Sequence, residues 1–430
     1  MLFGKEDYRK KNLGKYLIGY ELSPKHVQIS YMKIGEEKPY TFSPVAGAQE
    51  YNIPLVLSFH REENLWRLGK EEDREEEDGS VSILGDLLTL AFKGECVSVG
   101  EITYDPRALL ALFVKKSLAL LSLELTLEKI AGIMFVLDYV DQNRITALRE
   151  MADYLRMGET DIRFIGKEES FFWYNLYSEA ALWRDQVLLF ELQGNRLSGY
   201  RLYLNRNTTP VVTIVRKEEH PSLSGRTGKE RGEEFLEICE RAVGENKVSA
   251  VYLIGEAFGE DWYQEALKFL CRNRRVFRGN NLYSKGACYG MYYSNQKDRL
   301  ASTHVFLGED KLLANVGMEL KRRGEDSYLV ILNGGSSWYE CRKEWEVILE
   351  DTKELEFVIT PLNGKEKKIY RMNLGGLSLV RQPLLRLQMK AEMISPGQLL
   401  IRAQDRGFGE FYPSAGRVWE EIIDNMEEMG

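Results

Sequence analysis

Cysteine and histidine are scarce in this chain of 430 residues, and neither type is clustered. The five cysteines are Cys96, Cys239, Cys271, Cys288 and Cys341, and the four histidines are His26, His60, His220 and His304. Because no two cysteines form a C-x-x-C pair, the spacing argues against both a disulfide framework and a zinc site. The dispersed histidines give little support to a metal or nucleophile site built on imidazole. We therefore expect the cysteines to be ordinary buried or half-buried thiols.

Long apolar runs and an excess of positive charge are absent as well. No stretch offers about 18 uncharged apolar residues, the length needed to span a bilayer, and the charged opening MLFGKEDYRKKN lacks the apolar core of a secretory signal. The formal net charge is -8, and the sequence has no basic stripe that would attract nucleic acid. We expect a cytoplasmic protein with no membrane span and no nucleic-acid partner.

Two patterns of apolar residues divide the chain. From residue 17 to about residue 293, strand-like apolar runs alternate with segments of helical spacing, which predicts an α/β region. Its opening, residues 16–32, reads as a hairpin that turns at Ser23, Pro24 and Lys25. From residue 315 onward the pattern has period two, with glycine, proline and asparagine between the runs, which predicts an all-β domain. The predicted fold class is α/β plus all-β.

Three charged or aromatic segments stand out. The acidic run KEEDREEED at residues 70–78 favours a solvated loop or exposed helix over an acidic binding tail. The basic segment RRVFRGNN at residues 274–281 either contacts an anionic ligand or pairs with the acidic surface. The aromatics of residues 171–177 lie at helical spacing and are expected in a core or between domains.

Several segments, read in chain order, resemble parts of the DnaK-type heat-shock chaperones. In the first two thirds, IGYELSP at 18–24 is similar to the family's first phosphate hairpin, G-I-D-L-G-T-T. The segment VLLFELQGNRLS at 187–198 lies where the second hairpin, D-L-G-G-G-T-F-D, belongs. The segment VYLIGE at 251–256 resembles the adenosine turn, V-L-V-G-G. Further on, DKLLANV at 310–316 resembles the interdomain linker, and residues 387–410 resemble the end of the substrate-binding β-sandwich.

The resemblance implies an actin-like (ribonuclease-H-like) two-lobed nucleotide domain followed by a β-sandwich. The expected boundaries are 1–185 for the first lobe, 186–300 for a compact second lobe, 301–316 for a linker, 317–415 for the β-sandwich and 416–430 for a C-terminal helix. The stretch between residues 204 and 250 is too short for the subdomain that the family inserts there, and the short final helix leaves no room for the family's helical lid.

The same resemblance implies candidate site residues. Glu21 and Glu191 match the two hairpin aspartates of the family, so they either hold magnesium for ATP or ADP or are solvated or salt-bridged carboxylates at strand ends. The nucleotide-binding candidates are Gly19, Ser23, Lys25, Gly194, Asn195, Gly255, Glu256, Gly279 and Lys285.

The hydrolytic set, however, departs from the family. Pro24 removes a backbone N–H that a phosphate needs, Gln193 and Asn195 replace glycines, and Glu256 places a carboxylate in the adenosine turn. We expect a chaperone-like protein that binds a protein or peptide partner, through β-augmentation of exposed strand edges, without efficient ATP hydrolysis. The alternatives are a divergent Mg-ATP-dependent ATPase that uses Glu21, Glu191 and Glu168 or Glu169, and an actin-type assembly or scaffold protein.

Overall fold

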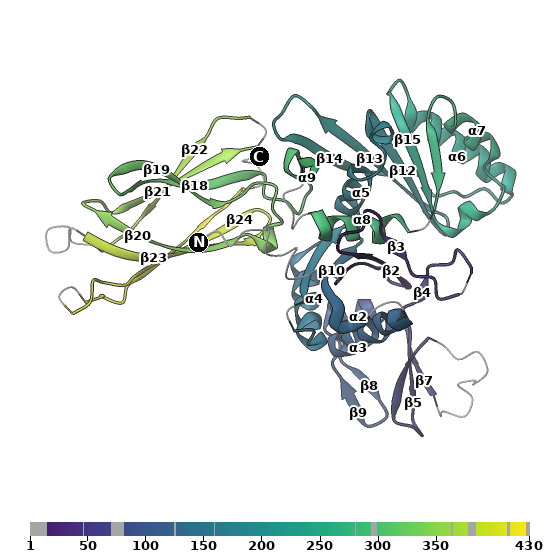
Figure 1. Ribbon diagram of the computed structural model, residues 1–430, viewed down its shortest axis with the longest axis horizontal. Helices are drawn as coiled ribbons and strands as arrows, with labels where there is room; N and C mark the ends of the chain where they lie inside the picture. Colours follow the sequence, from purple (N-terminus) through teal and green to yellow (C-terminus); the bar gives the residue numbers. More distant parts are fainter. Residues whose placement is uncertain are drawn as a thin grey trace. The chain divides into compact units, whose positions relative to one another are not determined.

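The structure is a computed structural model, and the chain divides into two compact units, Met1–Val305 and Phe306–Gly430 (Figure 1). The residues it describes are 15–45, 47–69, 81–123, 126–158, 160–279, 281–293, 299–362, 364–376, 384–410 and 413–426. The acidic run at 70–78 lies outside them. No helix in the described ranges is long and apolar enough to cross a bilayer.

The first sheet of the first unit has the strand order β11-β10-β1-β2-β3, with β4 also paired to β2. Its strands are β1 (Tyr16–Leu22), β2 (His26–Lys33), β3 (Tyr40–Thr41), β4 (Ile53–Pro54), β10 (Ile130–Leu137) and β11 (Asp161–Gly166). β1 is antiparallel to β2, which confirms the predicted hairpin, and parallel to β10. β10 is in turn parallel to β11 and is buried along its whole length, as its continuous apolar run requires of a strand covered on both faces.

The second sheet repeats this arrangement with the order β16-β15-β12-β13-β14-β17. Its strands are β12 (Gln186–Gln193), β13 (Arg196–Asn205), β14 (Val211–Glu219), β15 (Val248–Ile254), β16 (Arg275–Arg278) and β17 (His304–Phe306). β12 is antiparallel to β13 and parallel to β15, which is parallel to β16. The two sheets therefore share one pattern, in which the first strand of a hairpin pairs in parallel with a strand much later in the chain.

Helices α5 (Lys167–Leu176) and α8 (Leu282–Tyr293) pack against each other, and Figure 1 shows them between the two sheets. α8 also contacts β1, β2 and β10, while α5 contacts β14. Glycines permit this close approach, since a Cβ atom on Gly286 would lie 2.1 Å from the carbonyl oxygen of Ser170. The aromatic side chains Phe171 and Phe172 are buried at this helix pair, as predicted for the aromatic segment.

The remaining elements complete the first unit. Its other helices are α2 (Leu87–Lys93), α3 (Pro106–Ala119), α4 (Gln142–Leu155), α6 (Gly228–Val243), α7 (Gln264–Leu270), α9 (Arg299–Thr303) and the short 3-10 turns η2 (Leu120–Leu123), η3 (Leu127–Lys129), η4 (Ala180–Trp183) and η5 (Glu256–Gly259). Two small sheets consist of β5 (Leu57–His60), β6 (Leu65–Leu68) and β7 (Val81–Leu84), and of β8 (Val97–Val99) and β9 (Ile102–Tyr104). α6 and α7 pack on the second sheet around a core that includes Phe190 and Phe235.

The second unit consists of two four-stranded antiparallel sheets, with the orders β19-β18-β21-β22 and β20-β23-β24-β25. The strands are β18 (Ala314–Arg322), β19 (Glu325–Leu332), β20 (Arg342–Glu350), β21 (Glu354–Pro361), β22 (Lys368–Asn373), β23 (Leu384–Ser395), β24 (Gln398–Asp405) and β25 (Val418–Ile423), with the 3-10 turn η6 (Trp338–Glu340). Alternate residues are buried along β23, as the period-two pattern predicts. The loop after β24 is held by the buried Asp405, which accepts the N–H of Gly407 at 2.9 Å and of Ala415 at 2.7 Å.

The prediction of a C-terminal helix at 416–430 is wrong in the described part of that range. Val418–Ile423 forms the strand β25, which pairs antiparallel with β24. The strand is anchored from the side as well, because Trp419 Nε1 donates to the carbonyl of Gly375 at 3.0 Å and Tyr370 donates to Glu421 at 2.5 Å.

Two further segments bear on the sequence expectations. The expected linker, 301–316, contains parts of α9 and β18 and the whole of β17, so only residues 307–313 lie between regular elements. Within them, the buried Lys311 donates to Ser337 Oγ at 2.7 Å and ties the segment to the second unit. Part of the basic segment 274–281 forms the strand β16, where Arg275 pairs with Glu179 at 2.6 Å, as in the second alternative for this segment, and Arg278 donates to the carbonyl of Phe258.

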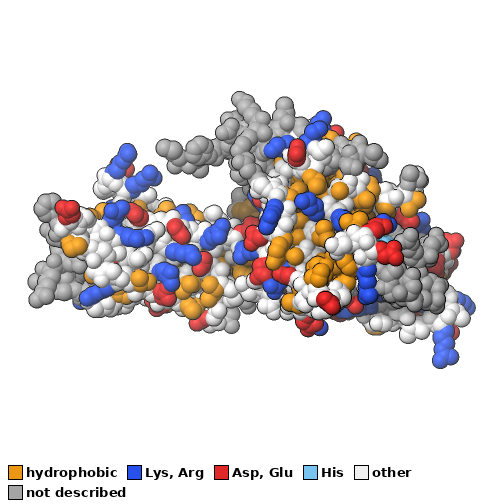
Figure 2. Space-filling model, turned by 90° about the horizontal axis from the view of Figure 1, so that it is seen from below, with side chains coloured by type: hydrophobic (Ala, Val, Ile, Leu, Met, Phe, Trp, Pro, Cys, Tyr) orange, Lys and Arg blue, Asp and Glu red, His pale blue; other side chains and the backbone are white. Residues whose placement is uncertain are grey.

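Charged side chains of both signs are distributed over the surface. On the coloured part of the face drawn in Figure 2, lysine and arginine side chains lie among aspartate and glutamate side chains.

Candidate functional site

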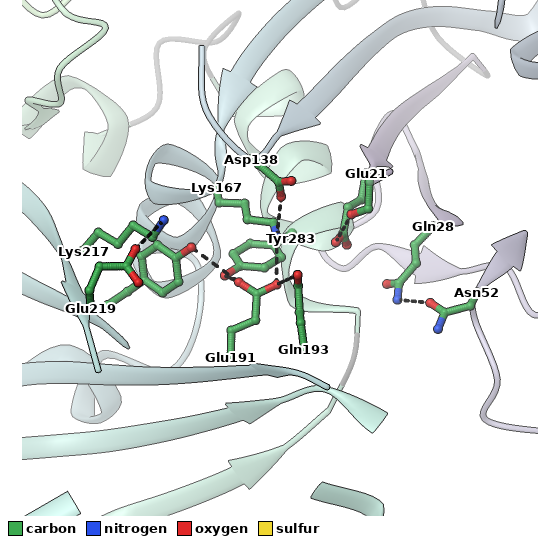
Figure 3. Close-up of polar contacts among 12 residues, drawn as sticks. Glu21, Gln28, Asn52, Asp138, Lys167, Glu191, Gln193, Lys217, Glu219 and Tyr283 are labelled. Atoms are coloured by element: carbon green, nitrogen blue, oxygen red, sulfur yellow. Dashed lines mark hydrogen bonds and ion pairs between the residues drawn. The ribbon is translucent and has the colours of Figure 1, made fainter. Parts of the chain in front are cut away.

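Glu21 and Glu191 occupy equivalent places in the two sheets of the first unit, near the ends of β1 and β12. Both side chains are buried, with residue exposures of 5% and 7%. Asp138 follows β10, and Lys167 is the first residue of α5, directly after β11. Since the carboxyl ends of parallel neighbours meet at one edge of a sheet, these strand ends deliver three carboxylates and one ammonium to one place (Figure 3).

The Lys167 ammonium lies between two of the carboxylates. Its Nζ is 2.6 Å from Oδ1 of Asp138 and 2.8 Å from Oε1 of Glu191, and its side chain is only 3% exposed. Burial alone would lower the pKa of Lys167, but Glu191, Asp138 and Glu21 together raise it well above its ordinary value. The lysine is therefore a permanent cation within the cluster.

Glu191 has hydrogen-bond donors on both of its oxygens. Oε1 accepts from Lys167 and from Gln193 Nε2, each at 2.8 Å, and Oε2 accepts from the hydroxyls of Tyr283 at 3.1 Å and Tyr200 at 3.4 Å. Burial, reinforced by the nearby Glu191, raises the pKa of both tyrosines, so that they remain neutral donors. Both oxygens of Glu191 therefore have donors, and its hydrogen-bond shell is filled.

Glu21 is in a different state. Its Oε1 accepts a long hydrogen bond from Ser23 Oγ at 3.4 Å, and its Oε2 is buried without a hydrogen-bond partner among the described residues. Burial raises the pKa of Glu21 to about 8, with Lys167 acting to lower it and Glu191 and Asp138 acting to raise it. Burial therefore favours the neutral carboxyl group over the carboxylate.

A second group of polar side chains lies beside the first and joins the two sheets. Gln28 of β2 donates from Nε2 to Oδ1 of Asn52 at 2.8 Å, and Asn52 donates from Nδ2 to Oε1 of Glu256 at 2.8 Å. Gln28 lies in β2 and Asn52 directly precedes β4, both in the first sheet, whereas Glu256 is the first residue of η5, which follows β15 of the second sheet. Glu256, which was a candidate for nucleotide binding, therefore accepts an internal hydrogen bond that joins the two halves of the unit.

Two of the predicted glycines serve the packing of the chain itself. A Cβ atom on Gly19 would lie 1.9 Å from the carbonyl oxygen of Ser284 in α8. Gly255 has a φ of +124°, and its Cβ atom would lie 2.1 Å from the carbonyl oxygen of Leu192. Both positions require glycine because another part of the backbone fills the space above them.

The other candidates do not converge on the cluster, apart from Ser23. Lys25 is exposed in the turn after β1, and Gly194 and Asn195 form the exposed two-residue turn between β12 and β13. Gly279 is exposed after β16, and Lys285 is half-buried on α8, where burial lowers its pKa. Of the two glutamates named for an ATPase, Glu169 is buried and accepts from Trp173 Nε1 at 3.3 Å within α5.

The residues present do not fit a magnesium nucleotide in this arrangement. A divalent cation bound to Glu21 and Glu191 would need both as ionised ligands with free lone pairs. Both oxygens of Glu191 already accept hydrogen bonds, from an ammonium and three neutral donors, and burial raises the pKa of Glu21, which opposes its ionisation. Lys167 supplies the positive charge that a metal would otherwise bring.

Sequence reasoning missed the residues that complete the cluster, namely Asp138, Lys167 and Tyr283. A signal existed for two of them, since Asp138 and Lys167 each directly follow a strand of the predicted parallel region. Strand-end positions of this kind converge at the topological edge where α/β folds place their sites. The family resemblance drew attention to the hairpins and the adenosine region instead.

The comparisons with known proteins give families without an assigned activity. A model of the C-terminal part of the family of unknown function DUF5716 matches residues 38–309, and a model of the domain of unknown function DUF8552 matches residues 311–425. No curated protein matches the chain. Since the first match covers more than half of the chain, the protein belongs to the DUF5716 family.

Proposed function

We propose that this protein is a non-hydrolysing, protein-binding scaffold built on an actin-like nucleotide fold of the DnaK type. The repeated order of strands in the two sheets supports two equivalent lobes, each with a hairpin whose first strand pairs in parallel with one later strand, which pairs in parallel with the next. The placement of α5 and α8 between these sheets is in keeping with lobes that meet at a pair of helices.

The observation that carries the proposal is the position of Lys167. An ammonium 2.6 Å from Asp138 and 2.8 Å from Glu191 neutralises the charges that a magnesium nucleotide would have to meet. Catalysis of phosphoryl transfer depends on a positioned metal and on pre-oriented charges. With an internal cation in that place, the cluster holds the two lobes together and does not activate a phosphate.

We assign partner binding to the second unit. In this proposal the unit is a β-sandwich whose edge strands pair with an extended segment of the partner. β20 and β25 are edge strands of one sheet, and they carry the exposed apolar side chains Ile348, at 62% exposure, and Ile422, at 45%. Exposed edges pair readily with another extended chain, and the side chains that flank them provide selectivity.

Fluorescence anisotropy tests this function directly. Labelled extended peptides selected from an array should bind the full chain, with an affinity that Mg-ATP leaves unchanged. Ile348→Glu and Ile422→Glu should weaken binding about tenfold, whereas Ile102→Glu, at an equally exposed position of the first unit (52%), should not. Binding that shifts tenfold with Mg-ATP, or steady ATP turnover that disappears in Glu191→Ala, would favour an ATPase instead. Concentration-dependent filaments would favour an actin-type assembly protein.

A further inference from the structure

Two buried oxygen atoms on neighbouring strands are left without hydrogen-bond partners in the described part of the chain. They are Oε2 of Glu21 and Oε1 of Gln28, whose residues are 5% and 2% exposed. Glu21 and Gln28 are directly opposed partners in the β1–β2 pairing, and side chains opposed in this way have Cβ atoms about 5 Å apart. Figure 3 shows both side chains pointing into the same space.

Glu21 Oε2 and Gln28 Oε1 are both acceptors, so they cannot form a hydrogen bond with each other as long as neither carries a hydrogen atom. An unpaired buried polar group is unfavourable, because it has given up its hydrogen bonds to water without gaining others. A single proton on Glu21 would remove both deficits at once, by giving the carboxyl group an O–H that can donate to Gln28 Oε1.

We infer that protonated Glu21 starts a directional relay of hydrogen bonds, Glu21 to Gln28 to Asn52 to Glu256, which fastens the first sheet to the second and opens when Glu21 ionises. The last two links are present at 2.8 Å each. The inference concerns regulation of the proposed scaffold and rests on that proposal, because it takes Lys167 as the fixed cation of the cluster.

The direction of the relay makes it sensitive to one proton. Gln28 offers its oxygen to Glu21 and its NH2 group to Asn52, which in turn offers its NH2 group to Glu256. If Glu21 is ionised, Gln28 must turn its NH2 group toward the new carboxylate, and its oxygen then faces Asn52. Asn52 must turn in response, and its oxygen then opposes the Glu256 carboxylate. Two acceptors cannot bond, so the contact between the sheets is lost.

The charged groups around both ends determine when this happens. Glu21 faces Lys167 of α5, which favours ionisation, and Glu191 of β12 and Asp138 after β10, which oppose it. Burial is the largest influence and brings the pKa of Glu21 to about 8. At the far end, Glu256 faces His26 at the start of β2, where burial, more than any neighbouring charge, lowers the pKa of the imidazole and keeps it neutral. The relay should therefore open within about one pH unit of 8.

Two native cysteines allow the opening to be measured in the full chain. Cys96 and Cys271 are exposed, whereas Cys239, Cys288 and Cys341 are buried. Cys96 lies beside β8, on the side of the first sheet, and Cys271 follows α7, on the side of the second. Spin labels on this pair report the distance between the two halves by pulsed electron paramagnetic resonance, without nucleotide and without metal.

The wild type should show one distance at pH 6.5 and a second, longer population that grows with a midpoint near pH 8. Glu21→Gln, which is permanently neutral, should keep the single distance up to pH 9.5. Glu256→Gln should also stay closed, because a reversed Asn52 can accept from its amide, yet Glu21 still titrates in that variant. Glu260→Gln, an exposed neighbour at the end of η5, should behave like the wild type.

A wild-type distance that does not change between pH 6.5 and 9.5 would overturn the relay, as would a Glu21→Gln variant that opens like the wild type. Either failure leaves the proposed function intact, since neither involves nucleotide or peptide. Conversely, tight binding of Mg-ATP at pH 6.5 would refute the proposed function while the pH-dependent distances stood.

Discussion

The ammonium of Lys167 lies 2.8 Å from Oε1 of Glu191, so the first residue of α5 is bonded to the end of the central strand of the second sheet. The same ammonium holds Asp138, which follows the central parallel strand of the first sheet. One side chain thereby links carboxylates from both halves of the unit. Formation of a buried ion pair requires desolvation of both charges, which is unfavourable. Removal of one partner destabilises the protein more strongly, because the other charge is left buried without a counter-charge.

Replacement of Lys167 by methionine should destabilise the first unit strongly. Without the ammonium, the buried Glu191 carboxylate loses its counter-charge, and the expected loss in unfolding free energy is about 3–5 kcal/mol. Urea denaturation followed by circular dichroism measures it. Lys285→Met is the matched control, since Lys285 is half-buried on α8 without an ion-pair partner among the described residues, and it should change stability by less than about 1 kcal/mol. Equal losses in the two variants would contradict the role given to Lys167.

The pH dependence of stability should carry the signature of Glu21. Its pKa is raised from an ordinary value of 4.5 to about 8, mainly by burial. Between these values the folded chain binds a proton that the unfolded chain has released, so this group contributes stability below pH 4.5 that is lost as the pH rises toward 8.

The variant Glu21→Gln isolates that contribution. It should gain stability relative to the wild type by up to about 1.4 kcal/mol for each pH unit in the window, as measured by thermal unfolding at pH 5.5 and pH 8. The gain should stop above pH 8. A difference between the two proteins that is the same at both pH values would show that Glu21 titrates normally.

Substitution of Gly19 by alanine should damage packing. The added Cβ atom would meet the Ser284 carbonyl oxygen at 1.9 Å and the Cys288 amide nitrogen at 2.5 Å, both backbone atoms of α8 that cannot move separately. Overpacking of this kind costs about 2–3 kcal/mol, measurable as a lower denaturation midpoint. Gly279→Ala, where the added atom meets nothing within 4 Å, should be neutral. If Gly19→Ala were also neutral, its glycine would need another explanation.

The loop that precedes β25 should depend on Asp405. This buried carboxylate accepts the N–H groups of Gly407 and Ala415, which leaves two donors unpaired in Asp405→Ala. We expect a loss of about 1–3 kcal/mol for the second unit and faster amide exchange in β25. Glu410→Ala, at an exposed position of the same loop, provides the comparison and should leave both quantities unchanged.

Much of the fold was predictable where local pattern and burial agree. β10 is one of the strand-like apolar runs of the predicted α/β region, and β23 carries the period-two pattern that predicted the all-β domain. The range that contains β25 was predicted as a helix, at 416–430. The segment forms a strand because β24, which is paired with β23 on one side, offers a free edge on the other side. That edge is formed by residues outside β25, so the local sequence does not reveal it.

The site was predictable only in part. The family resemblance identified Glu21 and Glu191, and the structure places both in one cluster through Lys167. Lys167 itself lies 24 positions from Glu191, and no local pattern links the start of a helix to a strand in the other sheet. Likewise, Gly19 is required because Ser284 of α8 packs against it. Gly19 and Ser284 are far apart in the sequence, so no local pattern predicts this contact.

The most direct test of the central claim is a thermal-shift titration of the wild type with Mg-ATP and Mg-ADP, compared with magnesium chloride alone. If Lys167 takes the place of the cation, millimolar nucleotide should leave the melting temperature unchanged, because a ligand raises it only by binding the folded state. A rise of several degrees with Mg-ATP that is lost in Glu191→Ala would contradict the account.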